Sequence, residues 1–145
     1  MRVIKQIIVH CSDSEFGNAE AINNWHKQRG WDGIGYHYVI MNGISEWNSE
    51  YDRKTDGKIE TGRQIERPGA HCEGSNYDSI GVCLIGKDAF TPLQIESLLT
   101  IIERARERFG KLAIYGHYEK SSGKKQGKTC PNIDMVEFRK KWSLN

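Results

Sequence analysis

Near its amino end the chain contains the stretch Ile4-Lys5-Gln6-Ile7-Ile8-Val9-His10, an apolar run that ends at a histidine. Residues 7–9 are consecutively apolar, a pattern typical of a strand that is buried on both faces and central in a sheet. A second apolar run, Ala113-Ile114-Tyr115-Gly116-His117, also ends at a histidine. Ligand sites in α/β sheets gather beyond the carboxyl ends of strands, so both imidazoles are expected where a ligand would bind.

Around these two strands, other apolar runs bounded by turn residues predict three more strands, at 36–40, 58–60 and 80–85. Helical spacing of apolar residues predicts three helices, at 19–29, 91–109 and near 133–142. Because helices alternate with strands, the sequence indicates an α/β fold. We expect a single domain over residues 1–145, with a central sheet of about five strands flanked by about three helices.

The helix at 91–109 has the strongest signals. Thr91 can cap its first turn, Pro92 fits that turn, and Gln94 completes a capping box. Apolar residues then recur at spacings of three and four, and Gly110 ends the helix.

The other two helices have weaker patterns. In the helix at 19–29, Ile22 is expected to point inward and His26 into solvent. The helix near 133–142 is expected to bury Trp142 together with its other apolar residues.

The composition is that of a globular chain. Among 145 residues, 37% are hydrophobic and 28% are charged, a balance that excludes the disordered and fibrous classes. No stretch approaches the roughly 18 apolar residues that a membrane span needs. Residues 1–6 place charge and an amide where the apolar region of a secretory signal would run, so we expect no signal peptide and synthesis in the cytoplasm.

The net charge of +2 conceals an uneven distribution along the chain. Residues 104–145 hold 11 Lys and Arg against 4 Asp and Glu, whereas residues 1–103 hold 10 against 15. A basic C-terminal third suits an anionic partner, such as nucleic acid, phospholipid or an acidic wall polymer. A solvated basic face explains the same charges equally well.

Three side chains, those of His10, His117 and Cys130, could form a metal site. Cys130 follows His117 by 13 residues, in a loop rich in Gly and Lys. Two His and one Cys would give zinc three protein ligands and leave a fourth position for water, which is the arrangement of a catalytic site. No local spacing forces the three residues together, so two histidines that are only hydrogen-bonded are the alternative.

Other signals of chemistry are weaker or absent. The four cysteines lack any C-x-x-C spacing, which favours free thiols or metal ligands, and Cys11 and Cys83 fit the pattern of small buried residues. His37 and His71 could line a cleft or could be surface histidines. No Gly-x-Ser-x-Gly motif is present, and no pair of carboxylates stands out for glycoside hydrolysis.

A series of sequence blocks along nearly the whole chain carries a family resemblance. The blocks are Val9-His10-Cys11-Ser12, Trp25-His26-Lys27, Gly30-Trp31, Gly35-Tyr36-His37-Tyr38-Val39-Ile40, residues 56–63, Gly69-Ala70-His71, Asn76 with residues 79–86, Phe90-Thr91-Pro92, Gly116-His117 and Lys128-Thr129-Cys130-Pro131. In these blocks the chain resembles the zinc-dependent N-acetylmuramoyl-L-alanine amidases that share the peptidoglycan-recognition-protein fold. It is most similar to the small phage amidases historically called lysozymes.

The resemblance implies a mixed sheet flanked by helices and one zinc ion per chain, bound by His10, His117 and Cys130. Zinc lowers the pKa of its bound water from about 15.7 towards 7 and so supplies a hydroxide nucleophile at neutral pH. The implied reaction is hydrolysis of the amide bond between N-acetylmuramic acid and L-alanine in bacterial peptidoglycan. The implied biological role is lysis of the host by a phage or prophage.

The resemblance also assigns roles to four other residues. The catalytic tyrosine of the family falls on Tyr36 and its catalytic lysine on Lys128. Lys128 lies two residues before a zinc ligand, so its ammonium can reach the developing oxyanion. Tyr36 either orients the water or donates a hydrogen bond to that oxyanion. His71 and His37 are expected to bind substrate, and support of a metal ligand is the alternative for His71.

The implied partner is peptidoglycan, with no nucleic acid bound, and a monomer is expected. The enzyme would be made in the host cytoplasm and would act on the wall after release through the membrane. Some phage relatives also bind phage RNA polymerase, so a regulator of transcription is one alternative function. A module that binds the wall without cutting it, and an enzyme of bacterial wall recycling or competition, are the others.

The polar segment 42–57 is expected to form an exposed loop. Residues 41–53 resemble an insertion relative to the small phage enzymes. Trp47 and Tyr51, which lie in this segment, could stack on sugar or peptide, or could pack within the loop itself.

Overall fold

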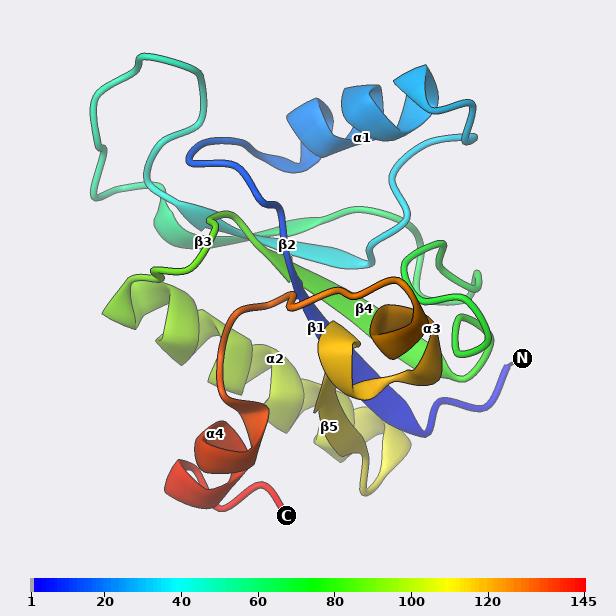
Figure 1. Ribbon diagram of the computed structural model, residues 1–145. Coiled ribbons are helices and arrows are strands. Elements are labelled where there is room, and N and C mark those ends of the chain that lie inside the picture. The colour runs from blue at the N-terminus through cyan, green and yellow to red at the C-terminus, as the bar shows by residue number, and fades with distance from the viewer. Residues whose placement is uncertain (1) are drawn as a thin grey trace.

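A five-stranded mixed sheet lies at the centre of the computed structural model, which describes residues 2–145 (Figure 1). The strands are β1 Gln6–Cys11, β2 Tyr38–Asn42, β3 Asp56–Thr61, β4 Ser79–Leu84 and β5 Ala113–Gly116. Their order across the sheet is β3-β2-β4-β1-β5. β1 runs parallel to both β4 and β5, β2 runs parallel to β4, and β3 pairs antiparallel with β2.

Helices cover both faces of this sheet. They are α1 Ala19–Gln28, α2 Pro92–Phe109, α3 Ser121–Lys125 and α4 Met135–Lys141, with a 3-10 turn at His117–Glu119. α1 lies over one face, whereas α2 and α4 lie over the other (Figure 1). α3 follows β5 through the 3-10 turn, so it extends beyond the carboxyl end of the sheet.

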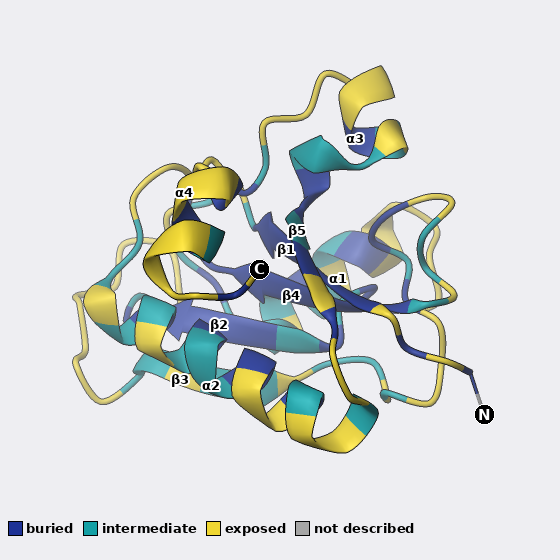
Figure 2. Ribbon diagram, turned by 90° about the horizontal axis from the view of Figure 1, so that it is seen from below, coloured by how far each residue is buried: buried dark blue, intermediate teal, exposed yellow. Residues whose placement is uncertain are grey.

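Two apolar clusters hold the layers together. The larger one joins the sheet to α2 and α4 and includes Leu98, Ile102 and Met135, each at most 2% exposed. The smaller one joins the sheet to α1 and includes Ile22. Every residue of β1 and β4 is buried (Figure 2), as the sequence predicts for β1 as a central strand.

The predicted strands and the three predicted helices are confirmed, each end lying within two residues of its expected position. The short helix α3 was not predicted, because Ser121-Ser122-Gly123-Lys124-Lys125 contains no apolar residue and hydrophobic spacing cannot reveal it. It packs instead through Gly123, where a Cβ atom would lie 2.0 Å from the carbonyl oxygen of His117.

The expected burial of Trp142 is wrong. Its side chain is among the exposed large hydrophobic residues, at 40% exposure. α4 ends at Lys141, so Trp142 is the cap residue where the chain leaves the helix. The chain then turns through Ser143, which has a positive φ of 55°, and Leu144 returns to the core in its place.

The loop between β2 and β3 is exposed, as predicted. Trp47, at 77% exposure, does not pack against the rest of the molecule. Tyr51 donates a hydrogen bond of 2.5 Å from its hydroxyl to Asp56 Oδ2, which ties the loop to the first residue of β3. No helix within residues 2–145 combines the length and the apolar character needed to cross a membrane.

The N-terminus of α2 carries the predicted capping box. Thr91 Oγ1 accepts a hydrogen bond from the backbone N–H of Gln94, and Gln94 Oε1 accepts one from the backbone N–H of Thr91. Thr91 Oγ1 also donates to Asp56 Oδ1 at 2.6 Å. Gln94 Nε2 donates to the carbonyls of Ile40 and Ile85, so the cap also fixes the helix to the sheet.

Replacing Thr91 with Ala is expected to lower the free energy of unfolding by about 1–2 kcal/mol, because the helix loses its cap and Asp56 loses a donor. Thr100→Ala is the matched control on the same helix. The Thr100 hydroxyl only donates to the carbonyl of Glu96, so stability should change by less than about 0.5 kcal/mol. Urea unfolding followed by circular dichroism measures both variants, and equal losses would contradict the importance given to the cap.

Candidate metal centre

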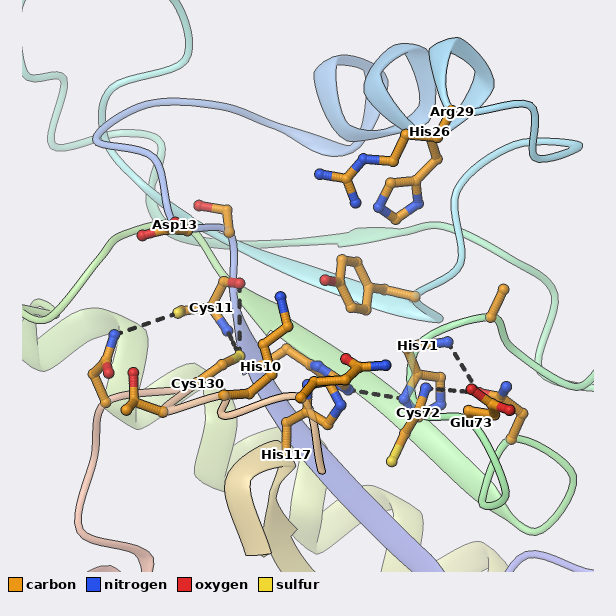
Figure 3. A pocket seen from close by; sticks show the side chains of 18 of the residues that line it. His10, Cys11, Asp13, His26, Arg29, His71, Cys72, Glu73, His117 and Cys130 are labelled. Carbon is orange, nitrogen blue, oxygen red and sulfur yellow. Dashed lines mark hydrogen bonds between the residues drawn. The ribbon is translucent and has the colours of Figure 1, made fainter. Parts of the chain in front are cut away.

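A cavity of about 590 Å³ opens at the carboxyl ends of β1 and β5 (Figure 3). Its walls come from five parts of the chain: the end of β1, the last turn of α1 with the segment that follows, the loop 70–76, the 3-10 turn and the loop 126–132. Four of the five histidines of the chain line this cavity: His10, His26, His71 and His117. It therefore lies where the two strand-end histidines predict a ligand site.

His10, His117 and Cys130 meet in this cavity. One nitrogen of each imidazole and the Cys130 Sγ atom all lie within 4.8 Å of one another. The pairing of β1 with β5 aligns Val9 with Gly116, each of which is followed by a histidine, and the two ring centroids are 4.7 Å apart. Among residues 2–145, these three form the one cluster of His, Cys, Asp and Glu found with metal-ligand spacing.

The loop that carries Cys130 is fixed to the end of β1 and to the 3-10 turn that follows β5. The backbone carbonyl of Cys130 accepts a hydrogen bond of 3.0 Å from the N–H of Tyr118 in the 3-10 turn. Its Sγ atom accepts one of 3.0 Å from the backbone N–H of Cys11 (Figure 3). A hydrogen bond with the Cys11 side chain, together with burial, raises the pKa of the Cys130 thiol. A coordinated divalent cation reverses this preference, because it deprotonates its thiol ligand outright.

Both imidazoles of the cluster favour the neutral form, which is the form that binds metals. Burial holds the pKa of His10 well below its usual value, and the neighbouring His71 acts in the same direction. Burial and then the charge of Lys128 lower the pKa of His117. The cluster thus combines two neutral nitrogen ligands with one sulfur ligand, a donor set that suits zinc.

Tyr36 and Lys128 line the same cavity. The Tyr36 ring lies 5.0 Å from the His10 ring, measured between centroids. Burial raises the pKa of the Tyr36 phenol well above 10, so the hydroxyl keeps its proton at neutral pH and can donate it to a hydrogen bond. The Lys128 side chain is exposed, and the backbone N–H of Lys128 is bound to the carbonyl of Gly123 at 2.8 Å.

His71 and His37, the two expected substrate-binding residues, lie in different surroundings. His71 lines the cavity, and its Nδ1 atom is 2.8 Å from His10 Nε2 (Figure 3). His37 is 1% exposed and is not among the residues that line this cavity. Its Nδ1 accepts from the N–H of Gly81 and its Nε2 bonds the carbonyl of Arg67, so both ring nitrogens are used to hold the fold.

His26 is a cavity residue that the sequence analysis placed wrongly in solvent. It is 5% exposed, its Nδ1 accepts from the N–H of Gly35, and its ring packs 4.5 Å from Trp31 and 5.4 Å from Tyr36. Its position four residues after Ile22, on the same face of α1, was the signal that could have revealed this burial.

The loop 70–76 forms a wall that no spacing in the sequence indicates. The side chain of Asn76 shapes it, because Asn76 Oδ1 accepts hydrogen bonds of 2.9 Å from the backbone N–H groups of both His71 and Cys72. Cys72 then meets Ser122 of α3 across the cavity rim, with 3.3 Å between Sγ and Oγ. This wall depends on side-chain contacts between segments that are distant in sequence.

The chain is similar in sequence to known proteins along most of its length. A family model described as N-acetylmuramoyl-L-alanine amidase matches residues 1–133. The endolysin of Escherichia phage T7 is 33% identical over 150 residues, which cover 96% of this chain and 85% of the relative. The endolysin of Enterobacteria phage K11 is 31% identical over 150 residues, covering 96% of this chain and 87% of the relative.

Solved structures share the fold. N-acetylmuramoyl-L-alanine amidase LysC from Clostridium intestinale URNW superposes with a TM-score of 0.76 at 24% identity, covering 98% of this chain and 87% of that one. Drosophila PGRP-LB superposes with a TM-score of 0.72 at 20% identity, covering 99% and 84%. The peptidoglycan-recognition fold expected from the sequence is thereby confirmed.

The buried histidines predict loss of stability in acid. Burial lowers the pKa of His37 from 6.5 to about 4, so between these pH values the unfolded chain binds a proton that the folded chain does not. The contribution of His37 to the free energy of unfolding is therefore complete above pH 6.5. It falls by about 1.4 kcal/mol per pH unit as the pH drops towards 4.

His37→Gln should remove this contribution from the pH slope of the unfolding free energy, whatever its effect on stability at pH 7. Urea titrations of the chelator-treated protein at several pH values measure that slope. The other buried histidines still contribute in the variant, so its slope should be smaller but not zero. An unchanged slope would show that His37 does not titrate as its burial requires.

Proposed function

Because the chain belongs to the N-acetylmuramoyl-L-alanine amidase family, we propose that it is an endolysin that hydrolyses the amide bond between N-acetylmuramic acid and L-alanine in peptidoglycan. The observation that carries the proposal is the meeting of His10, His117 and Cys130 in a cavity that Tyr36 and Lys128 also line. Family membership supports the reaction type, and the donor set supports a metal hydrolase.

We assign His10, His117 and Cys130 as the ligands of one zinc ion. When bound, zinc supplies Lewis acidity that activates water at neutral pH and polarises a carbonyl oxygen. A backbone group of the protein favours the charged form of the sulfur ligand. The N–H of Cys11 stabilises the Cys130 sulfur as a thiolate, since a charge-assisted hydrogen bond is stronger than a neutral one.

Tyr36 and Lys128 are the proposed catalytic residues. The Tyr36 phenol keeps its proton, and we therefore assign it as a hydrogen-bond donor to the carbonyl oxygen of the scissile amide. The Lys128 ammonium adds positive charge to the same cavity, where after burial it is the second cause that lowers the pKa of His117. Both groups act where negative charge develops, which is where fixed donors contribute most to the rate.

The proposed amidase domain comprises residues 1–145. The family model ends at residue 133, yet Met135 and Phe138 of α4 belong to the main core, so the last helix is part of the same folding unit. The proposed partner is peptidoglycan. The proposed route is synthesis in the host cytoplasm followed by release to the wall.

The reaction is tested by mass spectrometry of purified peptidoglycan after digestion. The proposal predicts stem peptides with a free L-alanine amino group, which appear with the zinc-loaded protein and disappear with a zinc chelator. Cys130→Ser should yield none and should bind zinc at least about 100-fold more weakly, because a direct ligand is lost. Cys72→Ser is the matched control, since a hydroxyl can still bond Ser122, and it should keep the zinc. New sugar reducing ends, or an undigested wall, would contradict the proposal.

The catalytic roles are tested by Tyr36→Phe and Lys128→Met. Each variant should lower kcat by about 100-fold or more while the zinc Kd stays within about threefold, because each loses a donor to developing charge and not a ligand. Lys125→Met is the control, since Lys125 is exposed on α3 and does not line the cavity. Activity in either variant as high as in this control would remove that residue from the mechanism.

A further inference from the structure

A series of hydrogen bonds runs from His10 to His71, which also lines the cavity, and from there to the buried Ser79. His10 Nε2 lies 2.8 Å from His71 Nδ1, His71 Nε2 lies 3.2 Å from Ser79 Oγ, and Ser79 Oγ lies 2.6 Å from the carbonyl oxygen of Ser75. The three side chains are buried, at 2%, 8% and 0% exposure for His10, His71 and Ser79. Because these side chains are largely shielded from water, their polar atoms need hydrogen-bond partners within the protein.

The carbonyl of Ser75, at the far end of this series of hydrogen bonds, fixes which atom donates and which accepts in every bond. A backbone carbonyl only accepts, so the single hydroxyl proton of Ser79 must point to Ser75. Ser79 Oγ is then left to accept, and His71 must donate to it from Nε2. None of the hydrogen bonds described for residues 2–145 brings a carboxylate to either imidazole, so no counter-ion favours a charged ring.

A neutral His71 that carries its proton on Nε2 has a lone pair on Nδ1. That lone pair accepts the proton of His10 Nε2. His10 then holds its own lone pair on Nδ1, and this is the nitrogen that is free for a metal. The hydroxyl of Ser79 thus determines which nitrogen of His10 carries the proton, although His10 is two hydrogen bonds away from it.

The His71 ring is also held in place by packing. A Cβ atom on Gly81 would lie 2.6–2.8 Å from three atoms of the ring, and one on Gly69 would lie 2.5 Å from His71 Cδ2. The imidazole therefore rests against the backbone of Gly81 and of Gly69, where any residue with a side chain would clash with the ring. Asn76 fixes the backbone of His71 itself through the bond to its N–H.

We propose that Ser79 and His71 act as positioning residues that fix the tautomer of His10, so that zinc is bound through His10 Nδ1. Neither residue touches the substrate or the metal in this scheme. The inference rests on the zinc site of the proposed function, and it goes beyond that site by naming the ligand atom and the residues that select it. It also gives His71 a support role in place of contact with substrate.

The direct test is nuclear magnetic resonance of the full chain labelled with 15N-histidine, since two-bond correlations distinguish the two ring nitrogens. In the chelator-treated wild type, His10 should carry its proton on Nε2, and in the zinc-loaded protein its Nδ1 signal should shift on coordination. A His10 ring protonated on Nδ1, or zinc bound through Nε2, would overturn the inference. If zinc does not bind, the proposed function fails, while the metal-free spectrum still decides the tautomer.

Variants provide the second test. Ser79→Ala removes the acceptor, so the His10 spectrum should show both tautomers and the zinc Kd should rise about 10- to 100-fold. Ser97→Ala is the matched control. It also removes a hydroxyl that donates to a backbone carbonyl, that of Gly57, but on α2 and away from the cavity, so the zinc Kd should stay within about twofold. A Ser79→Ala protein with unchanged tautomer and zinc affinity would overturn the inference.

A pair of His71 variants covers the case in which Ser79→Ala does not fold. His71→Asn places an amide oxygen where it can still accept from His10 Nε2, whereas His71→Leu cannot accept. The inference predicts weaker zinc binding in His71→Leu, by about 10- to 100-fold, and at least a partial rescue in His71→Asn. Equal affinities in the two variants would assign His71 a merely structural role.

Discussion

The parallel pairing of β1 with β5 is the constraint on which the site depends. It aligns Val9 with Gly116, and in this register each of the two is followed by a histidine at the same edge of the sheet. The register matters because a shift by one residue would turn His10 to the opposite face of the sheet, where Ile7 and Val9 belong to the main core. Cys130, the third residue of the cluster, joins them from a loop that hydrogen bonds to the end of β1 and to the 3-10 turn.

Burial sets the chemistry of the groups that converge there. A low-dielectric surrounding disfavours charge, so the histidines are neutral and the phenol of Tyr36 keeps its proton. These are the protonation states that a metal ligand and a hydrogen-bond donor require. The two imidazoles of the cluster thus already favour the form that can bind a metal, whereas the Cys130 thiol would still have to lose its proton. The same burial makes the fold sensitive to acid, because each imidazole must be charged when the chain unfolds at low pH.

The sequence predicted the strands, the three longer helices and the capping box at Thr91, because these depend on local spacing and local hydrogen bonds. It could not indicate α3, which packs through the bare backbone of Gly123. Asn76 was noted only as part of a resemblance, and its hydrogen bonds to the backbone of the loop 70–76 could not be foreseen. Strand ends suggested the two histidines, and Cys130 was a candidate third ligand that no local spacing fixed in place. Resemblance to a family then favoured Cys130 and added Tyr36 and Lys128 to the site. The roles of these residues are still predictions that the variants described above are designed to test.

The central claim is that three distant segments form one zinc site with two nitrogen ligands and one sulfur ligand. X-ray absorption spectroscopy at the zinc edge of the loaded protein tests it most directly. The account predicts one zinc per chain with one sulfur neighbour at about 2.3 Å and nitrogen or oxygen neighbours at about 2.0–2.1 Å. A zinc shell without sulfur, or a protein that takes up no stoichiometric zinc, would contradict the account.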